Sequence, residues 1–516
     1  MQVAQPFRAA SRGCSAALQG CHIGDGGSGI GDGGWALTSV ALLLALAGCS
    51  RASEPRAAPV IQLADCELPG VNGPARCGAY EVWEDREAAA GRRIELRLVV
   101  LPARGAERAA DPVFYFAGGP GASAIGAAVG IAALLRPVNE SRDLVFVDIR
   151  GTGRSRPLGC PIHADEEPLQ RYFDEFLADD YVRNCLAAQQ TDVRFYTHPI
   201  AMDDINEVRA ALGYQQINLY GASGGTRQAQ LYARRHAASV RTIVLHGVQP
   251  MDAEMPLSFA RALDHGIGAL IGACRESPAC HATYPDLAAD WEQSRRRFES
   301  GFAEAEVSHP STGRREGVRI TRGVYADGVR HLLYDTGRAW EVPALIHSAA
   351  RGDFGPFAQR ELAQALAYSR LLQYGMFLST TCAEDVTFID DDDIRRATEG
   401  TFLGDYRVRR QQAACRIWPR GAGIDAGFQQ PLRSTVPVLV LSGDADVATP
   451  PADAERAIRD LPNARHIVFP NQSHAFSNPA CAGQLILAFV TVGSASGLET
   501  SCVAATRRPP FTPGAE

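Results

Sequence analysis

A serine at position 223 lies where a nucleophile could be presented to a substrate. Gly221–Gly225 has the pattern G-x-S-x-G and lies between a run of β-forming residues, 216–220, and a helix-like segment, 226–236. Small residues around the serine permit the sharp strand-to-helix turn called a nucleophile elbow, which exposes the hydroxyl. In a chain with 50 glycines the pattern alone also fits a purely structural turn. The strand–turn–helix setting favours the elbow, so we expect Ser223 to attack a carbonyl carbon.

Residues that could activate this serine come late in the chain, each behind another β-forming run. His474 closes a small polar loop behind the run RHIVF, whereas His466 lies inside that run, where a packed histidine is expected. Asp444 and Asp446 both follow the run VPVLVL; either could face the site while the other serves as a turn residue. A serine nucleophile needs a histidine base that a carboxylate orients. The chain order serine, aspartate, histidine is that of α/β-hydrolases.

A second glycine-rich loop could stabilise the negative charge that such an attack creates. Ala117–Gly121 (AGGPG) follows the run PVFYF. Glycines let backbone N–H groups approach a developing oxyanion, so we expect the amides of Gly119 and Gly224 to form an oxyanion hole. The alternative is a tight loop without a catalytic role. No Lys-Ser or Lys-Thr pair follows the glycines, so a phosphate-binding loop is not supported.

The overall composition excludes several other chemistries. The chain has 516 residues and a formal net charge of −7, and all 51 of its Lys+Arg residues are arginine. Lysine Schiff-base chemistry and lysine-dependent phosphate transfer are therefore ruled out. The mildly acidic balance argues against a nucleic-acid partner. No cysteine and histidine spacing fits a zinc site, so the sequence predicts neither a metal nor a cofactor.

The elements that must position these groups alternate along the chain between short β-forming runs and helix-like segments. Two runs of alternating polarity, 79–83 and 93–101, predict an antiparallel edge pair. Six nearly continuous apolar runs predict strands buried on both faces, at 112–116, 143–149, 216–220, 241–245, 436–441 and 465–469. This alternation indicates a mostly parallel, doubly wound α/β sheet. No comparable strand is predicted from 251 to 376, where a helical, arginine-rich stretch indicates a cap inserted over the strand ends.

The N-terminal region carries an export signal. Residues 35–48 form an apolar run of signal-peptide length, too short to span a membrane comfortably. The run ends in Leu46–Cys49 (LAGC), which resembles the lipobox of bacterial lipoproteins, where cleavage leaves the cysteine as a lipidated N-terminus. An ordinary secretory signal is the alternative. The sequence therefore predicts an exported bacterial protein, either a periplasmic lipoprotein anchored to the outer membrane through Cys49 or a secreted protein.

These features divide the chain into five predicted segments. A lipoprotein-type signal peptide covers 1–48, and a tether covers 49–65. The α/β core is predicted in two parts, 66–250 and 377–516, with the helical cap at 251–376 between them.

Ten cysteines beyond the N-terminal region are spread singly along the chain. Their even number favours disulfides formed in an oxidising compartment, and buried free thiols are the alternative. Sequence alone does not fix the connectivity, but pairing of neighbours along the chain would give Cys66–Cys77, Cys160–Cys185, Cys274–Cys280, Cys382–Cys415 and Cys481–Cys502.

With their surroundings, these motifs make the sequence similar to the secreted tripeptidyl aminopeptidase and prolyl iminopeptidase branch of the α/β-hydrolase superfamily. The similarity covers roughly 66–502 and rests on AGGPGAS (117–123), DIRGTGRS (148–155), GASGGTRQAQLYARRH (221–236), CRESPACHATYPDL (274–287), TCAEDV (381–386), SGDADVATPP (442–451) and SHAF (473–476). By motif position, the resemblance implies Ser223 as nucleophile and His474 as base. It implies Asp446, rather than Asp444, as the orienting acid. The family's cysteine spacing also resembles the five pairs above.

The resemblance implies an extracytoplasmic serine aminopeptidase that releases short N-terminal units, such as proline, small residues or tripeptides, through an acyl-enzyme. A carboxylesterase or lipase with the same triad is the alternative, and a binding protein with a degenerate hydrolase fold is a third interpretation. The expected partners are a peptide or ester substrate, and a membrane only through the lipid anchor. Two residues depart from the family pattern, because Ala117 replaces a histidine and Gly224 replaces a bulky aromatic residue.

An aminopeptidase must also bind the charged amine of its substrate. In prolyl iminopeptidases a glutamate after the cap does so, and the resemblance makes Glu384 the nearest match and Asp385 its competitor. A buried ammonium needs a fixed carboxylate, because an unpaired buried charge is costly. The alternative is that both side chains only cap or solvate a loop.

Overall fold

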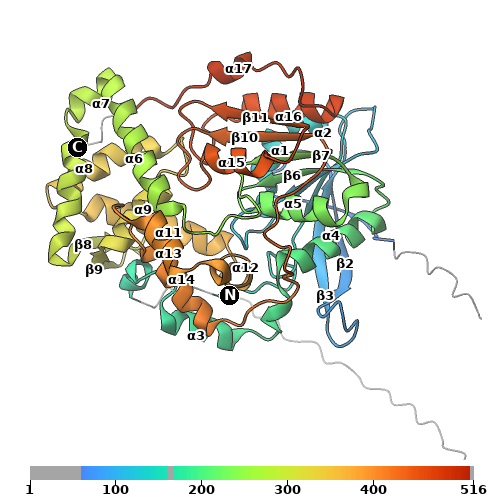
Figure 1. Cartoon of the computed structure of the whole chain (residues 1–516), viewed down its shortest axis with the longest axis horizontal. Helices are drawn as coiled ribbons and strands as arrows, with labels where there is room; N and C mark the ends of the chain where they lie inside the picture. Colours follow the sequence, from blue (N-terminus) through green and yellow to red (C-terminus); the bar gives the residue numbers. More distant parts are fainter. Residues whose placement is uncertain (1–59, 161–167, 512–516) are drawn as a thin grey trace, which may run out of the picture. The chain divides into compact units, whose positions relative to one another are not determined.

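The computed structural model describes residues 60–160 and 168–511. Its main sheet has nine strands in the order β1-β2-β3-β5-β4-β6-β7-β10-β11 (Figure 1). The strands are β1 (Ala64–Cys66), β2 (Ala75–Trp83), β3 (Arg93–Leu101), β4 (Val113–Phe116), β5 (Leu144–Val147), β6 (Ile217–Ala222), β7 (Val240–His246), β10 (Val438–Gly443) and β11 (Ala464–Phe469). β1, β2, β3 and β5 pair antiparallel in turn, and all other neighbours are parallel. The predicted mostly parallel sheet with an antiparallel edge is confirmed.

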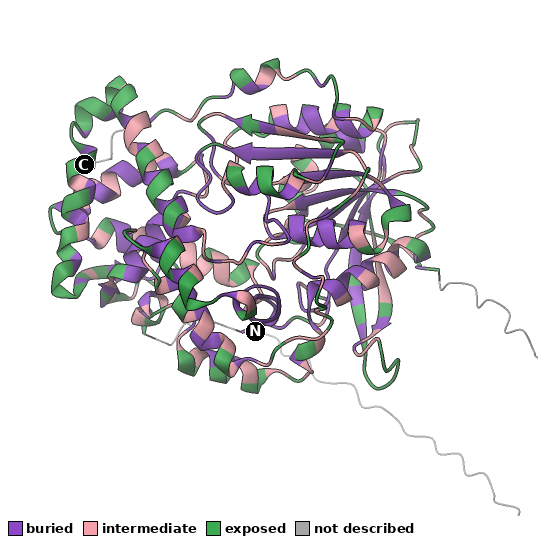
Figure 2. Ribbon diagram, in the orientation of Figure 1, coloured by how far each residue is buried: buried purple, intermediate pink, exposed green. Residues whose placement is uncertain are grey.

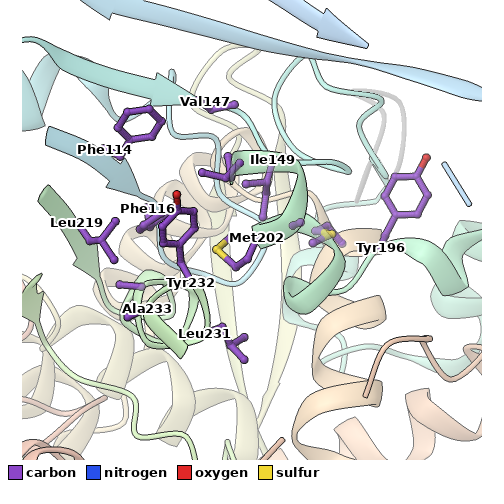
Figure 3. Close-up of a cluster of buried hydrophobic side chains, with 14 of the residues drawn as sticks. Phe114, Phe116, Val147, Ile149, Tyr196, Met202, Leu219, Leu231, Tyr232 and Ala233 are labelled. Carbon is purple, nitrogen blue, oxygen red and sulfur yellow. The ribbon is translucent and has the colours of Figure 1, made fainter. Parts of the chain in front are cut away.

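Helices cover both faces of this sheet and give it two hydrophobic cores. One face is covered by α1 (Ala128–Leu134), α2 (Arg136–Asn139) and α16 (Ala480–Val492), and the other by α4 (His198–Ala211), α5 (Gly225–Arg235) and α15 (Pro451–Ile458). Figure 3 shows part of the second core, where Phe116 and Leu219 lie with Tyr232 of α5. Because both faces of the central strands are covered, β4 and β5 are buried at every position. This explains their uninterrupted apolar sequences. Figure 2 shows much of the middle of the sheet in the purple of buried residues.

Between β7 and β10 the chain forms a long, mostly helical insertion, much of which shares its own hydrophobic core. Its helices are α6 (Phe259–Glu276), α7 (Pro278–Thr283), α8 (Leu287–Arg296), α9 (Arg322–Leu332), α10 (Val342–Ala350), α11 (Gly355–Leu371), α12 (Tyr374–Glu384), α13 (Asp391–Thr398) and α14 (Tyr406–Ile417). Outside the insertion, two further helices are α3 (Asp179–Ala188) and α17 (Ser501–Ala504). Helix α12 extends past residue 376, and α13 and α14 follow it before β10. The boundaries 251 and 376 stay predictions.

The insertion also contains a β-hairpin, which no continuous apolar run between 251 and 376 predicts. β8 (Phe302–Ser308) and β9 (Arg315–Thr321) pair antiparallel with each other, apart from the main sheet. Charged residues such as Glu304 and Arg319 occupy alternate, exposed positions of the two strands. One solvated face removes the continuous apolar run by which the buried strands were recognised.

The described residues contain five disulfides, and they are the five pairs that the sequence suggests. Each of the five joins two separate elements: β1 to β2, the loop after β5 to α3, α6 to α7, α12 to α14, and α16 to α17. These links are spread over both the sheet and the insertion, which is consistent with folding in an oxidising compartment.

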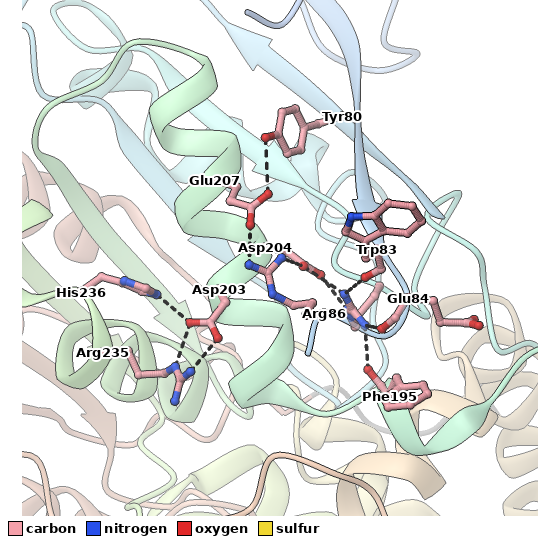
Figure 4. Close-up of polar contacts among 11 residues, drawn as sticks. Tyr80, Trp83, Glu84, Arg86, Phe195, Asp203, Asp204, Glu207, Arg235 and His236 are labelled. Atoms are coloured by element: carbon pink, nitrogen blue, oxygen red, sulfur yellow. Dashed lines mark hydrogen bonds and ion pairs between the residues drawn. The ribbon is translucent and has the colours of Figure 1, made fainter. Parts of the chain in front are cut away.

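A buried arginine joins the antiparallel edge of the sheet to α4, and Figure 4 labels residues that it contacts, among them Asp204, Trp83 and Phe195. Arg150, in the DIRGTGRS motif after β5, is fully buried and makes two hydrogen bonds with the Asp204 carboxylate, at 2.7 and 3.0 Å. It also donates to the backbone carbonyls of Trp83, Glu84 and Phe195. Burial raises the pKa of Asp204, although the Arg150 charge opposes this shift. The arginine of this motif therefore has a structural role in joining β2, β5 and α4.

No described helix is long and apolar enough to cross a membrane. The predicted signal peptide, Cys49 and the tether up to residue 59 lie outside the described residues.

Candidate active site

The structure places Ser223 on a strand-to-helix elbow, as the sequence predicts. The residue lies between β6 and α5 with a φ of 55°, a left-handed conformation that is costly for a residue with a side chain. Its N–H donates to the carbonyl of His246 at 2.8 Å, which fixes the turn against β7. A Cβ on Gly221 would lie 2.5 Å from the Gly225 carbonyl oxygen, and one on Gly225 would lie 2.0 Å from that of Phe116. Both positions therefore require glycine.

His474 and Asp446 form a hydrogen-bonded pair, with 2.8 Å between Nδ1 and Oδ2. The amides of Ala448 and Thr449 donate to the other carboxylate oxygen at 2.7 and 2.9 Å, and the Thr449 hydroxyl donates to Oδ2 at 2.9 Å. Burial alone would raise the pKa of Asp446, but His474 and these donors lower it below its usual value. An ionised Asp446 orients the imidazole so that Nε2 is the nitrogen that can accept a proton.

The geometry distinguishes between the alternative acids and the alternative bases that the sequence motifs left open. Asp444 is exposed and, among the described residues, makes no hydrogen bond with His474; its carbonyl instead faces His265 Nε2 at 2.8 Å. His466 is bonded to Ser442 and Glu455, away from the elbow. The arrangement expected of an acid and a base is therefore found at Asp446 and His474.

Ser223 and His474 line the same cavity, which has a volume of about 790 Å³. In the described part of the chain no hydrogen bond joins the Ser223 hydroxyl to His474. Such bonds are often long without substrate and tighten when it binds. Core and insertion both contribute to the wall, for example through Tyr220 of β6 and Tyr334 and Glu361 of the insertion. A substrate at Ser223 would therefore contact both parts of the protein.

The two predicted oxyanion donors, Gly119 and Gly224, lie next to each other. A Cβ on Gly224 would be 3.5 Å from the Gly119 nitrogen, and Gly118 packs directly against Ser223 Cβ. Within residues 60–160 and 168–511, neither amide donates a hydrogen bond to another protein group. Both N–H groups are thus available to bind an oxyanion beside Ser223.

Polar residues outside the site hold this glycine loop in place. Asp148 is buried and accepts hydrogen bonds from the Ser123 hydroxyl at 2.6 Å and from the Ile125 amide at 3.1 Å. Gln228 Nε2 donates to the carbonyl of Ala117 at 3.0 Å, so the position that departs from the family histidine is still anchored through its backbone. At Gly224, the other departure, an added Cβ would meet only ordinary contacts, so glycine there leaves extra space beside Ser223.

Of the two carboxylates predicted to bind a substrate amine, only Asp385 lines the cavity. Glu384 is 1 % exposed, and its carboxylate accepts from the His198 backbone amide and pairs with His198 Nδ1, both at 2.7 Å. The structure therefore does not support Glu384 in that role; neighbours on a helix point about 100° apart, and the sequence did not fix the phase of α12. Asp385 is itself bonded to Arg227 at 2.7 Å and to the Met255 amide at 3.2 Å.

A carboxyl group that the sequence did not single out also lies on the cavity wall. Glu361 is on α11, and its Oε2 is buried without a hydrogen-bond partner in the described part of the chain. Burial, reinforced by the Asp327 carboxylate, raises the pKa of Glu361 to about 8, against the opposing charges of Arg360 and Arg330. The helix around it contains several polar residues, so nothing in its pattern distinguishes Glu361 from a solvated side chain.

A second histidine borders the cavity without competing for the role of base. Tyr220 Oη lies 3.3 Å from His246 Nδ1, and the His246 ring contacts Phe476, with 4.4 Å between ring centres. Burial, and to a smaller extent the nearby His474, lower the pKa of His246 to about 4. His246 therefore stays neutral near pH 7.

No group of three or more potential metal-binding side chains is found in the described ranges.

The chain is similar in sequence to known hydrolases and peptidases. The family model described as "alpha/beta hydrolase fold" matches residues 111–477, a range that includes Ser223, Asp446 and His474. "Serine protease Hip1" of Mycobacterium tuberculosis is 26% identical over 530 residues, covering 90% of this chain and 96% of that protein. "Tripeptidyl aminopeptidase" of Streptomyces lividans is 27% identical over 202 residues, 36% of this chain and 37% of that protein. A crystal structure of proline iminopeptidase from Mycobacterium smegmatis covers 80% of this chain and 98% of its own, at 16% identity and a TM-score of 0.39.

Proposed function

The chain belongs to the α/β-hydrolase fold family and is a serine hydrolase, and from this premise we propose that it is an exported aminopeptidase that releases short N-terminal units from peptides. The observation that supports this proposal best is the cavity that Ser223 and His474 share, with His474 hydrogen-bonded to Asp446. Glu361 also lines this cavity, and its Oε2 has no hydrogen-bond partner among the described residues. The names of the similar proteins, a serine protease and a tripeptidyl aminopeptidase, support a peptide substrate.

The proposed mechanism is acyl transfer through Ser223. His474 Nε2 takes the hydroxyl proton as Oγ attacks the scissile carbonyl carbon, and Asp446 stabilises the imidazolium. The amides of Gly119 and Gly224 bind the oxyanion, and each such donor contributes about 3 kcal/mol to the barrier reduction. His474 then gives its proton to the leaving amine as the C–N bond breaks. A water molecule, deprotonated by His474, hydrolyses the ester of Ser223 and releases the N-terminal unit.

Recognition of the free amine is assigned to the carboxyl groups of the cavity. Glu361 is the stronger candidate, because Asp385 is already bonded to the buried Arg227. A substrate ammonium beside Glu361 would favour the ionised carboxylate and give the buried oxygen a partner. Binding of the amine at a fixed point would then limit how many residues reach Ser223, which is how an aminopeptidase sets the length of its product.

A substrate panel tests this proposal. Free-amine peptide p-nitroanilides, their N-acetylated forms and p-nitrophenyl esters should be compared with wild type, Glu361→Gln and Asp385→Asn. We expect wild type to prefer free amines, and Glu361→Gln to raise KM for them by about tenfold or more while ester hydrolysis is retained. Glu299→Gln, an exposed glutamate of the insertion, is the matched control. Equal cleavage of free and blocked peptides would contradict the aminopeptidase proposal, and a loss confined to Asp385→Asn would transfer the role to that residue.

A carboxylesterase is the second candidate, and the largely apolar cavity wall favours it. Side chains that contribute to this wall include Ile131, Leu134, Phe259, Phe377 and Phe476. In that case the same panel would show rapid ester hydrolysis and negligible release of p-nitroaniline from every peptide.

The location of the protein is part of the proposal. The five disulfides support an oxidising compartment, and the LAGC sequence supports lipidation of Cys49 after removal of 1–48. Wild type should partition into the detergent phase, and Cys49→Ala should not. A mature N-terminus other than Cys49 would exclude the lipid anchor.

A further inference from the structure

One segment of the insertion is hydrogen-bonded to the loop that carries His474. We call Tyr334–Thr336, which follows α9, the clamp segment. The Thr336 hydroxyl accepts from the Ser473 amide at 2.6 Å, just before the histidine. Directly after the histidine, the Ala475 amide donates to the Tyr334 carbonyl at 2.8 Å, and the Ala475 carbonyl accepts from the Thr336 amide at 3.1 Å. The clamp segment therefore binds the loop on both sides of His474.

The same segment also contacts the imidazole ring. The Tyr334 ring lies edge-to-face with His474, with 5.2 Å between ring centres and 79° between planes. The Tyr334 hydroxyl accepts a hydrogen bond of 2.6 Å from Arg330. Arg330 is fully buried and bonded to Asp327 at 2.8 Å, so the tyrosine is held from the interior of the insertion.

Asp446 by itself leaves part of the orientation of His474 undetermined. Its hydrogen bond fixes Nδ1, but the imidazole can still tilt about this contact and move Nε2 away from Ser223. A displacement of about 1 Å at a reacting group can cost about 100-fold in rate. The remaining constraint must come from the loop backbone and from the ring's neighbours, and the clamp segment supplies both.

We propose that the clamp segment is a positioning element for the general base: Thr336 and Tyr334 hold His474 in the orientation in which Nε2 accepts the Ser223 proton. This inference rests on the proposed function, in which His474 is the base. It assigns to the insertion a part in the chemical step itself, in addition to covering the substrate. It also predicts that the insertion is required for activity on substrates too small to need a cap.

The test uses the full chain and a substrate that reports on chemistry rather than on recognition. Thr336→Val removes the hydroxyl that binds the Ser473 amide, and Thr336→Ser keeps it. On p-nitrophenyl acetate and on a free-amine peptide alike, we expect Thr336→Val to lower kcat by about 10- to 100-fold with little change in KM. Thr336→Ser should recover most of the rate. Thr283→Val, at an exposed threonine of the insertion, should match wild type.

Tyr334 offers an independent variant pair. Tyr334→Leu removes the ring beside His474 and should lower kcat on both substrates with little change in KM, because the imidazole loses the aromatic ring that restricts its tilt. Tyr334→Phe keeps the ring and should retain more activity. Thermal unfolding of each variant shows whether it is folded at the assay temperature; a variant with a normal melting curve and a low kcat has lost positioning rather than structure.

The rate of fluorophosphonate labelling separates failure of this inference from failure of the proposed function. Labelling of Ser223 should be slower in folded Thr336→Val than in wild type and Thr336→Ser. Wild-type kcat and labelling rates in both Thr336→Val and Tyr334→Leu would overturn the clamp, and so would losses confined to the peptide substrate, which would indicate a substrate contact instead. If wild-type Ser223 is not labelled at all, the proposed function fails.

Discussion

A second group of a serine, a histidine and a carboxylate lies in the described part of the chain, and it differs from the group at the elbow in what surrounds it. In this group, on β10, β11 and α15, Ser442 Oγ lies 2.9 Å from His466 Nε2, and His466 Nδ1 lies 2.5 Å from a Glu455 carboxylate oxygen. Judged by these contacts alone, it is more complete than the group at the elbow, because no hydrogen bond joins Ser223 and His474 in the described chain.

The two groups differ in the backbone conformation of the serine and in whether the serine lines the cavity. Ser442 is a fully buried residue within β10, and neither it nor His466 lines the cavity. Ser223 lies on a left-handed turn beside two unused amides and faces the cavity. A nucleophile needs an approach for its substrate and donors for the oxyanion, which a residue inside a strand lacks. Hydrogen bonds among side chains therefore identify a bonded trio, whereas the elbow and the cavity identify a candidate active site.

Replacing each histidine should give the largest contrast between the two groups. His474→Asn removes the base and should lower kcat by about 10⁴- to 10⁶-fold. His466→Asn removes only a packing and hydrogen-bonding partner and should change kcat by less than about tenfold. Initial rates on a p-nitrophenyl ester check both. Comparable losses in the two variants, each shown to be folded, would break the distinction.

Replacing the carboxylate of each group should also lower kcat more at the elbow than at β10 and β11, but with a smaller contrast than the histidine variants give. Asp446→Asn keeps the shape but loses the charge and the correct imidazole tautomer, so kcat should fall by about 10⁴-fold. Glu455→Gln should have little effect, because its side chain is 65% exposed and is not on the cavity. Asp444→Asn should likewise leave the rate close to wild type, and a larger loss there than in Asp446→Asn would reverse the assignment of the acid.

A third contrast concerns pH and the unpartnered carboxyl group of Glu361. Its raised pKa means that the native protein holds a proton between about pH 4.5 and 8 that the unfolded chain has lost. Wild-type stability should therefore decrease with rising pH relative to Glu361→Gln, by up to about 1.4 kcal/mol per pH unit in this window. Thermal unfolding of both proteins at pH 5, 6, 7 and 8 measures the difference. A constant difference across the series would show that Glu361 ionises normally.

The smallest effect is expected at Ser442. Ser442→Ala removes one internal hydrogen bond and should lower the free energy of unfolding by about 1 kcal/mol, with kcat unchanged. Chemical denaturation and an ester assay check these two expectations. A loss of activity without a loss of stability would mean that Ser442 has a role that its buried setting does not show.

Much of the fold follows from local sequence, because buried parallel strands leave continuous apolar runs. Those runs located β4 to β7, β10 and β11 correctly. β1 has only three residues and leaves no pattern, and the β8–β9 hairpin has one solvated face, so both were missed. Neighbour pairing of the ten cysteines gave the five disulfides because each loop closes between elements that are adjacent in the fold.

The sequence predicts those residues of the candidate site that lie in turns directly after strands. Ser223, Asp446 and His474 each follow a strand of the sheet, so their motifs place them at one edge. Glu361 and the clamp segment depend instead on how the insertion folds back over that edge, a long-range contact that no local pattern specifies. The prediction that Glu384 binds the substrate amine lacks structural support for a related reason. The side of α12 that faces the cavity is set by packing, which the local sequence does not specify.

Ser223, and not Ser442, is the proposed nucleophile. Wild type, Ser223→Ala and Ser442→Ala should each be incubated with a fluorophosphonate, and the modified peptide should be identified by mass spectrometry. We expect a single adduct on Ser223 in wild type and in Ser442→Ala, and none in Ser223→Ala. An adduct on Ser442, or labelling that persists in Ser223→Ala, would contradict this assignment.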